Sequence, residues 1–199
     1  MVSHDEIRHD TLGMINHTKE MLEMIYEGFR KHNLSSIGNV EEVEEKLHKD
    51  SECLLKSIHG ESPNEDVKHF IPVPEYFDSI GEGLNTLFNA TKKKIRDDIL
   101  FSDKSVKETY KLFDETLVLL NSVSHCINTS NGELAKNMDG NGKRLCELSD
   151  EYAIFHEDRL IAGVCTPKSA PVYLDILESF RNVIWHLRKI LQEFFVELK

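Results

Sequence analysis

The stretch Pro72–Phe88, PVPEYFDSIGEGLNTLF, decides how the rest of the sequence is interpreted. Proline is tolerated in the first turn of a helix, so the two prolines indicate that a helix begins here. Apolar residues then recur at helical spacing on one stripe, which comprises Phe77, Ile80, Leu84, Leu87 and Phe88. Asp78 and Glu82 fall at roughly 100° and 140° around the helix from the start of that stripe. Both carboxylates are therefore expected to point away from the core.

The same pattern returns one hundred residues later, at Ala170–Leu187, APVYLDILESFRNVIWHL. Asp78 aligns with Glu178, and Glu82 aligns with Asn182. In both copies a proline-marked entry precedes an apolar stripe that has a polar face beside it. An internal repeat of this length indicates two similar halves. Their predicted boundaries are residues 1–101 and 102–199.

Composition favours an ordinary globular protein without nucleic-acid partners. The chain has 199 residues, of which 40% are hydrophobic and 30% charged, enough to bury a good core. Its net charge, 24 − 35 = −11, repels nucleic acid. No stretch approaches the roughly 20 apolar residues that a membrane span requires, so no span is expected.

The four cysteines, Cys53, Cys126, Cys146 and Cys165, form neither a C-x-x-C pair nor a zinc-ribbon spacing. We expect them to be small buried residues with free thiols. Free thiols persist in a reducing compartment, so the protein is expected to be cytoplasmic.

The periodicity predicts an all-α fold with six helices in two tandem three-helix bundles. The predicted helices cover about residues 3–31, 39–59, 73–100, 104–128, 131–162 and 169–197. Ser3 and Glu6 form a capping box at the first of them. The sequence Asp139–Gly142, DGNG, contains four poor helix formers and could interrupt the fifth.

The second predicted helix is crowded with acidic side chains and allows two interpretations. Its carboxylates could be a solvated face. Alternatively, Glu44 and His48, which are four residues apart on one face, could supply two ligands to a metal site.

At this point the chain resembles the PhoU family of phosphate-uptake regulators, in particular the PhoU-like domains associated with sodium/phosphate cotransporters. The first half carries the resemblance in Phe77–Glu82, FDSIGE, and Ile95–Lys104, IRDDILFSDK. The second half carries it in Arg159–Pro167, RLIAGVCTP, and Leu174–Ser179, LDILES. The resemblance covers most of the chain, and it implies two tandem three-helix bundles related by a pseudo-twofold repeat.

The resemblance also implies a site and a function. The family's acidic motif is associated with clusters of iron or zinc ions, and it maps onto Asp78 and Glu82 in the first half. In the second half Glu178 matches, but Asn182 replaces the second acid and Arg181 would repel a cation. The implied function is non-enzymatic regulation of phosphate transport, through docking to a membrane phosphate transporter or a signalling protein, with a homodimer as a further option.

Two other classes of function stay open at the level of sequence. One is a metal-free helical adaptor, in which Asp78 and Glu82 are simply a solvated face. The other is a helical-bundle metalloenzyme. Enzymes of that class place carboxylates and Glu-x-x-His pairs inside the bundle, and no Glu-x-x-His lies on a suitable stripe here.

Overall fold

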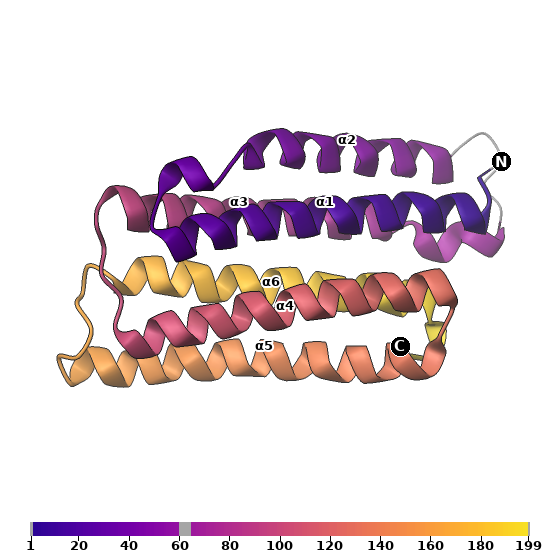
Figure 1. The fold of residues 1–199 in the computed structure, drawn as a ribbon. Coiled ribbons are helices and arrows are strands. Elements are labelled where there is room, and N and C mark those ends of the chain that lie inside the picture. Colours follow the sequence, from indigo (N-terminus) through magenta and orange to yellow (C-terminus); the bar gives the residue numbers. More distant parts are fainter. Residues whose placement is uncertain (1, 60–64, 199) are drawn as a thin grey trace.

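The computed structural model describes residues 2–59 and 65–198, and these residues are helical without any strand (Figure 1). Six long helices follow one another along the chain, as predicted. They are α1 (His4–Lys31), α2 (Val40–Ile58), α3 (Val73–Arg96), α4 (Asp103–Thr129), α5 (Gly132–Ile161) and α6 (Ala170–Phe194). Short 3₁₀ turns span Leu34–Ser36, Glu65–Phe70 and Val196–Leu198.

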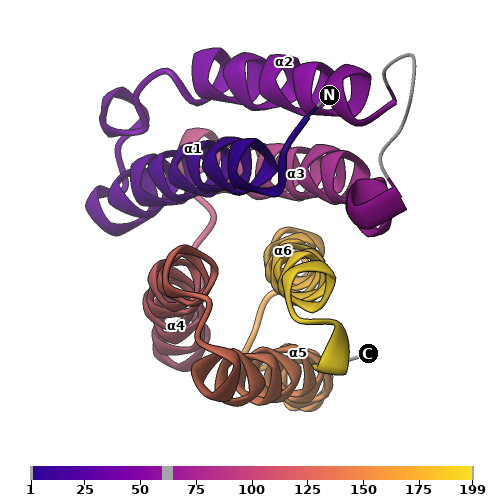
Figure 2. The ribbon, with the colours of Figure 1, turned by 90° about the vertical axis from the view of Figure 1, so that its right-hand side faces the viewer.

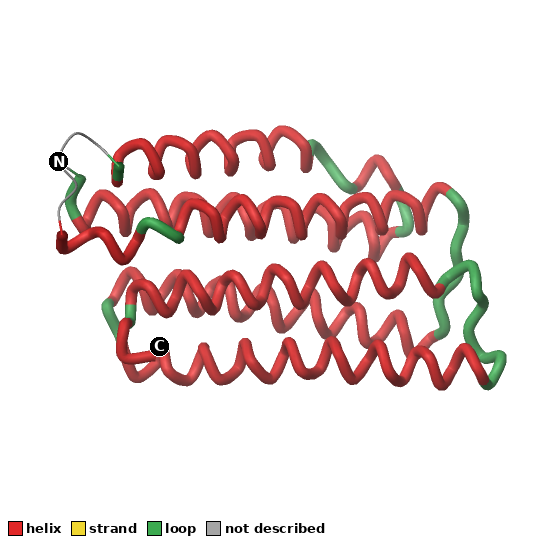
Figure 3. Tube along the Cα trace, turned by 180° about the vertical axis from the view of Figure 1, so that it is seen from behind, coloured by secondary structure: helices red, strands yellow, loops and turns green. Residues whose placement is uncertain are grey.

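The helices form two three-helix bundles packed against each other. Helices α1, α2 and α3 contact one another, and so do α4, α5 and α6. The bundles meet through α1 with α4 and, most extensively, through α3 with α6. Seen along the helices, α2 and α5 lie at opposite outer edges, with the other four between them (Figure 2). Figure 3 shows that the connections gather at the two ends of the helices.

One continuous hydrophobic core joins the two bundles. Phe113 of α4 is completely buried, and its ring stacks on Tyr26 of α1 with 4.5 Å between centroids. The same ring meets Phe180 of α6 edge-on at 4.8 Å. Aromatic contacts of this geometry add to the free energy gained from burial alone. The two halves are therefore not independent cores.

Local sequence signals account for where the helices begin. At α1 the Ser3 hydroxyl accepts a hydrogen bond from the Glu6 backbone N–H, and the Ser3 N–H donates to Glu6 Oε2 at 2.7 Å. This is the predicted capping box. Prolines lie in the first turns of α3 and α6, where the missing N–H costs nothing.

Helix α3 ends at Arg96, four residues earlier than predicted. Asp98 adopts a left-handed conformation, φ 47°, and the Ile99 N–H donates to the Lys94 carbonyl at 2.9 Å. This hydrogen-bond pattern terminates a helix, although glycine usually occupies the left-handed position. Ile99 is 2% exposed, so burial of its side chain favours the turn that stops the helix.

Helix α5 runs through the DGNG sequence without the interruption that its poor helix formers suggested. Asp139 accepts hydrogen bonds from Arg188 and Gln192 of α6, which hold this turn in place. A Cβ at Gly142 would lie 2.6 Å from Arg188 Cγ, so the glycine allows α5 and α6 to approach closely. Tertiary contacts thus override a weak local propensity.

All four cysteines are free thiols, but their burial differs from the prediction. Cys126 and Cys165 are buried and Cys146 is partly buried, whereas Cys53 is exposed on α2. Among the helices of the described residues, none combines the length and apolar character needed to cross a bilayer.

Candidate functional site

The predicted site residues of the first half line one groove between α2 and α3. Its volume is about 310 Å³, and its polar lining consists of Glu44, His48, Asp78 and Glu82. Helix α2 contributes the first two and α3 the last two. Phe77, which precedes Asp78, is completely buried, whereas Glu82 is exposed. The helical phase predicted from the sequence is therefore confirmed.

Two polar contacts connect the facing helices across this acidic groove. His48 Nδ1 lies 3.1 Å from Asp78 Oδ1, and both side chains remain substantially exposed. The Asn85 side-chain amide donates to Glu44 Oε1 at 3.2 Å. Gly81 of α3 faces Leu47 of α2 in the same groove, where an added Cβ would make only an ordinary contact at 3.7 Å. The groove thus gathers carboxylates and an imidazole, the ligand types that suit iron or zinc.

The donor set is chemically suitable for a cation, but it is not arranged as a formed metal site. Within residues 2–59 and 65–198, no three His, Cys, Asp or Glu side chains are grouped so that they could hold one metal ion. The four side chains lie at the surface, so their rotamers can change without repacking the core. Asp78, Glu82, His48 and Glu44 are accordingly the residues that would hold an ion here.

The corresponding surface of the second half is a larger hollow, about 410 Å³, with a different charge pattern. Its lining includes Cys146, Asp150, Glu178, Arg181, Asn182, Trp185 and His186. Arg181 donates to both oxygens of Glu178, at 2.6 and 3.0 Å, and lies 3.7 Å from Asp150. Trp185 at the edge of this hollow is 43% exposed.

This second arrangement does not fit a cation. The Arg181 guanidinium already neutralises Glu178 and would repel a metal ion placed between them. The Asn182 side-chain oxygen is buried without a hydrogen-bond partner among the described residues. It packs 2.5 Å from the point where a Cβ on Gly83 would stand, so it fills the contact between α3 and α6.

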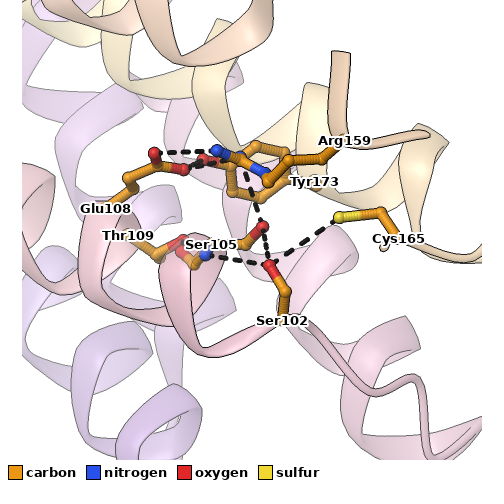
Figure 4. Close-up of polar contacts among 7 residues, drawn as sticks. All are labelled: Ser102, Ser105, Glu108, Thr109, Arg159, Cys165 and Tyr173. Carbon is orange, nitrogen blue, oxygen red and sulfur yellow. Dashed lines mark hydrogen bonds and ion pairs between the residues drawn. The ribbon is translucent and has the colours of Figure 1, made fainter. Parts of the chain in front are cut away.

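A buried polar network in the second bundle was not apparent from the sequence (Figure 4). Glu108 of α4 is 3% exposed and accepts from both terminal nitrogens of Arg159 of α5, at 2.7 and 3.1 Å. It also accepts a hydrogen bond from the Tyr173 hydroxyl of α6 at 2.5 Å. Burial, followed by the contact with Glu108, raises the pKa of Tyr173 far above its usual value. One carboxylate therefore ties together all three helices of this bundle.

The network continues towards the connection that follows α5. Arg159 donates to the Ser105 hydroxyl at 3.4 Å, and the hydroxyls of Ser105 and Ser102 are 2.9 Å apart. The Cys165 thiol donates to the Ser102 hydroxyl, with 3.7 Å between Sγ and Oγ. Arg159 and Cys165 both belong to the stretch on which the resemblance rests. Here both side chains form hydrogen bonds with residues at the start of α4.

Burial of His156 beside this network predicts a pH dependence of stability. The ring is 1% exposed, neither nitrogen has a hydrogen-bond partner among the described residues, and Tyr173 lies 4.6 Å away. Burial, then repulsion by Arg159, lowers the pKa of His156 below 6.5, while Glu108 and Glu157 oppose the shift. In the unfolded chain the ring binds a proton as the pH falls through about 6.5, but in the folded chain it does not.

Stability should therefore fall as the pH decreases below the unfolded pKa. We expect His156→Leu to reduce the loss in free energy of unfolding between about pH 7.5 and about pH 5.5. Burial also lowers the pKa values of His4 and His186, so part of the dependence should remain. Urea denaturation at the two pH values measures the difference. An identical loss in variant and wild type would contradict this role for His156.

The structure thus places Asp78 and Glu82 beside Glu44 and His48 in one groove, whereas Glu178 and Asn182 lie in a separate hollow. Sequence spacing placed each pair on one helix face, but only packing brought α2 and α3 side chains together.

Comparisons of the chain with family models, curated proteins and solved structures found no match.

Proposed function

We propose that this protein is a non-enzymatic, PhoU-like regulator of phosphate transport that acts by docking to a membrane transporter or a signalling partner. The observation that carries the proposal is the repeated architecture. Two three-helix bundles pack through their third helices, α3 and α6. Each of these helices has a proline in its first turn and an acid at the matching surface position, Asp78 or Glu178. The resemblance drawn from the sequence implies this arrangement.

The exposure of the acidic residues favours a binding role over catalysis. Asp78 and Glu82 line an open surface groove, whereas bundle metalloenzymes direct their carboxylates into the interior. Among the buried carboxylates of the described chain, Glu108 is neutralised by Arg159 and Tyr173. A cation in the groove would relieve the repulsion between Asp78 and Glu82, which lie four residues apart on one helix and repel by roughly 0.2–0.5 kcal/mol.

Phosphate uptake in the organism that encodes the protein tests the proposal. Deletion of the gene should change the rate of uptake of radiolabelled phosphate, and the wild-type protein should restore it. The variant Asp78→Ala/Glu82→Ala should restore it poorly, because the groove loses two of its four ligand-bearing side chains. Glu41→Ala/Glu45→Ala removes two exposed acids of α2 outside the groove and should restore uptake fully. Uptake that is unchanged by deletion would refute the proposed function.

Elemental analysis of the same proteins, purified without chelator, separates a metal-dependent from a metal-free mechanism. We expect near-stoichiometric iron or zinc in the wild type and in Glu41→Ala/Glu45→Ala. The content should fall to background in Asp78→Ala/Glu82→Ala. If the wild type contains no metal but still restores uptake, the acidic pair is a solvated face and regulation proceeds by protein docking alone.

A further inference from the structure

The outward side of α5 carries an unusual group of exposed apolar side chains. Helix α5 packs against α4 and α6 and forms one outer edge of the molecule (Figure 2). Ile154 is 60% exposed, Phe155 48% and Ile161 86%. Ile154 and Ile161 are seven residues apart, so they share one face of the helix. Single exposed apolar residues are ordinary, but a group on one face marks an interaction site.

Acidic side chains surround these apolar residues. Glu147, Glu151 and Asp158 fall on the same face by helical spacing, and all three are exposed. Neither Glu151 nor Asp158 has an ion-pair partner among the described residues, and Glu147 is 3.9 Å from Lys143. The one basic residue between positions 147 and 161 is Arg159, which points inward to Glu108. We call Glu147, Glu151, Ile154, Asp158 and Ile161 the α5 outer face, and Phe155 lies on its flank, about 100° around the helix from Ile154.

Helix α2 provides an internal comparison, because it occupies the opposite outer edge. Three of its acids pair with lysines four residues away, Glu42–Lys46, Glu45–Lys49 and Glu52–Lys56, at 3.1, 2.6 and 3.2 Å, and Glu41 lies 3.7 Å from Lys92 of α3. Among the described residues of α2, Leu55 is the one large apolar side chain that is exposed, at 40%. An outer helix of this fold can therefore be largely paired in charge and largely polar. The α5 outer face is neither.

From this asymmetry we infer that the α5 outer face docks a helix of a partner protein whose apolar stripe is flanked by lysine and arginine. Ile154 and Ile161 would bury against the stripe, and Glu147, Glu151 and Asp158 would pair with the flanking cations. A second copy of α5 would bring like charges together, which disfavours self-association through this face. The inference rests on the proposed function and specifies the docking surface and the class of partner.

Peptide binding to the whole protein tests this inference. The probe is a fluorescein-labelled peptide of about 18 residues, five helical turns, with leucines on one face and lysines elsewhere. A second peptide of the same composition has its leucines scattered around the helix. Fluorescence anisotropy at about 0.15 M salt should show binding of the amphipathic peptide and at least about tenfold weaker binding of the scattered one.

Variants of the two outer helices locate the binding site. Ile154→Ser/Ile161→Ser and Glu151→Gln/Asp158→Asn should each weaken binding about tenfold, because each removes one of the two complementary features. The matched control on α2, Glu45→Gln/Leu55→Ser, should bind like the wild type. Far-ultraviolet circular dichroism should be the same for all variants, since every substituted side chain is exposed.

Three outcomes would overturn the inference. Equal binding of the two peptides would show nonspecific attraction to an acidic protein. Unchanged binding by both α5 variants would place the site elsewhere. A dimer in sedimentation that Ile154→Ser/Ile161→Ser dissociates would identify a second copy as the occupant. Phosphate uptake is measured in a separate experiment. A negative result with the peptide would therefore refute only the docking face, and unchanged phosphate uptake after gene deletion would refute only the proposed function.

Discussion

Replacement of Glu108 by alanine should lower the free energy of unfolding by about 3–5 kcal/mol. The carboxylate accepts from Arg159 at 2.7 and 3.1 Å and from the Tyr173 hydroxyl at 2.5 Å. Its removal leaves a guanidinium that is only 14% exposed without a counter-charge and a fully buried hydroxyl without an acceptor. Urea denaturation followed by circular dichroism measures the loss.

Two further variants distinguish the buried network from charge removal in general. Glu115 lies on the same helix as Glu108 and forms an exposed pair with Arg144 of α5 at 3.6 Å, so Glu115→Ala should cost less than about 1 kcal/mol. Replacement of the three side chains by apolar groups, Glu108→Leu/Arg159→Met/Tyr173→Phe, should recover much of the loss, because none of the three positions then holds an unpaired polar group. If Glu108→Ala and Glu115→Ala lower the free energy of unfolding by the same amount, the network does not stabilise the bundle.

Phe113→Ala is expected to have an effect of similar size, about 3–5 kcal/mol, because it opens a cavity where the two bundles meet. The ring is completely buried between Tyr26 of α1 and Phe180 of α6. The loss should appear in a single unfolding transition, because one core is shared by both bundles. Circular dichroism reports on all helices and Trp185 fluorescence on α6, so the two signals should coincide.

The control for Phe113→Ala lies one and a half turns away on the same helix. Val118 is 61% exposed, so Val118→Ala should change the free energy of unfolding by no more than about 0.5 kcal/mol. Separate transitions for the two signals in the wild type would show that residues 1–101 and 102–199 unfold as independent domains. A small effect of Phe113→Ala would show that the aromatic contacts do not couple the bundles.

Local patterns in the sequence were sufficient for the class of fold and for most helix positions. Helix α1 was predicted at residues 3–31 and spans His4–Lys31, because the capping box and the apolar period act within a few turns. The end of α3 was missed by four residues, since it depends on a left-handed Asp98 and on the burial of Ile99. Continuity of α5 was likewise uncertain, because Asp139 is held by side chains of α6.

The candidate site was predicted one helix at a time. Asp78 and Glu82 were placed on an outward face by helical phase, and Glu44 and His48 were paired by spacing alone. Their meeting in one groove, with His48 3.1 Å from Asp78, depends on how α2 lies against α3. The sequence carried no signal for the Glu108–Arg159 pair, because 51 residues separate its members.

The sequence by itself determined that this protein is all-helical, that it repeats one three-helix plan, and that acids occupy the outward faces. These properties depend on periodicity and capping, which act between residues a few positions apart. Only the tertiary structure decided which of the outward acids have an ion-pair partner. It directed Arg159 to Glu108, so that Glu151 and Asp158 on the outward side of α5 have no ion-pair partner among the described residues, whereas three acids of α2 pair with lysines of the same helix. The contact between Glu108 and Arg159 joins residues that are 51 positions apart, and the local pattern of the sequence does not contain it.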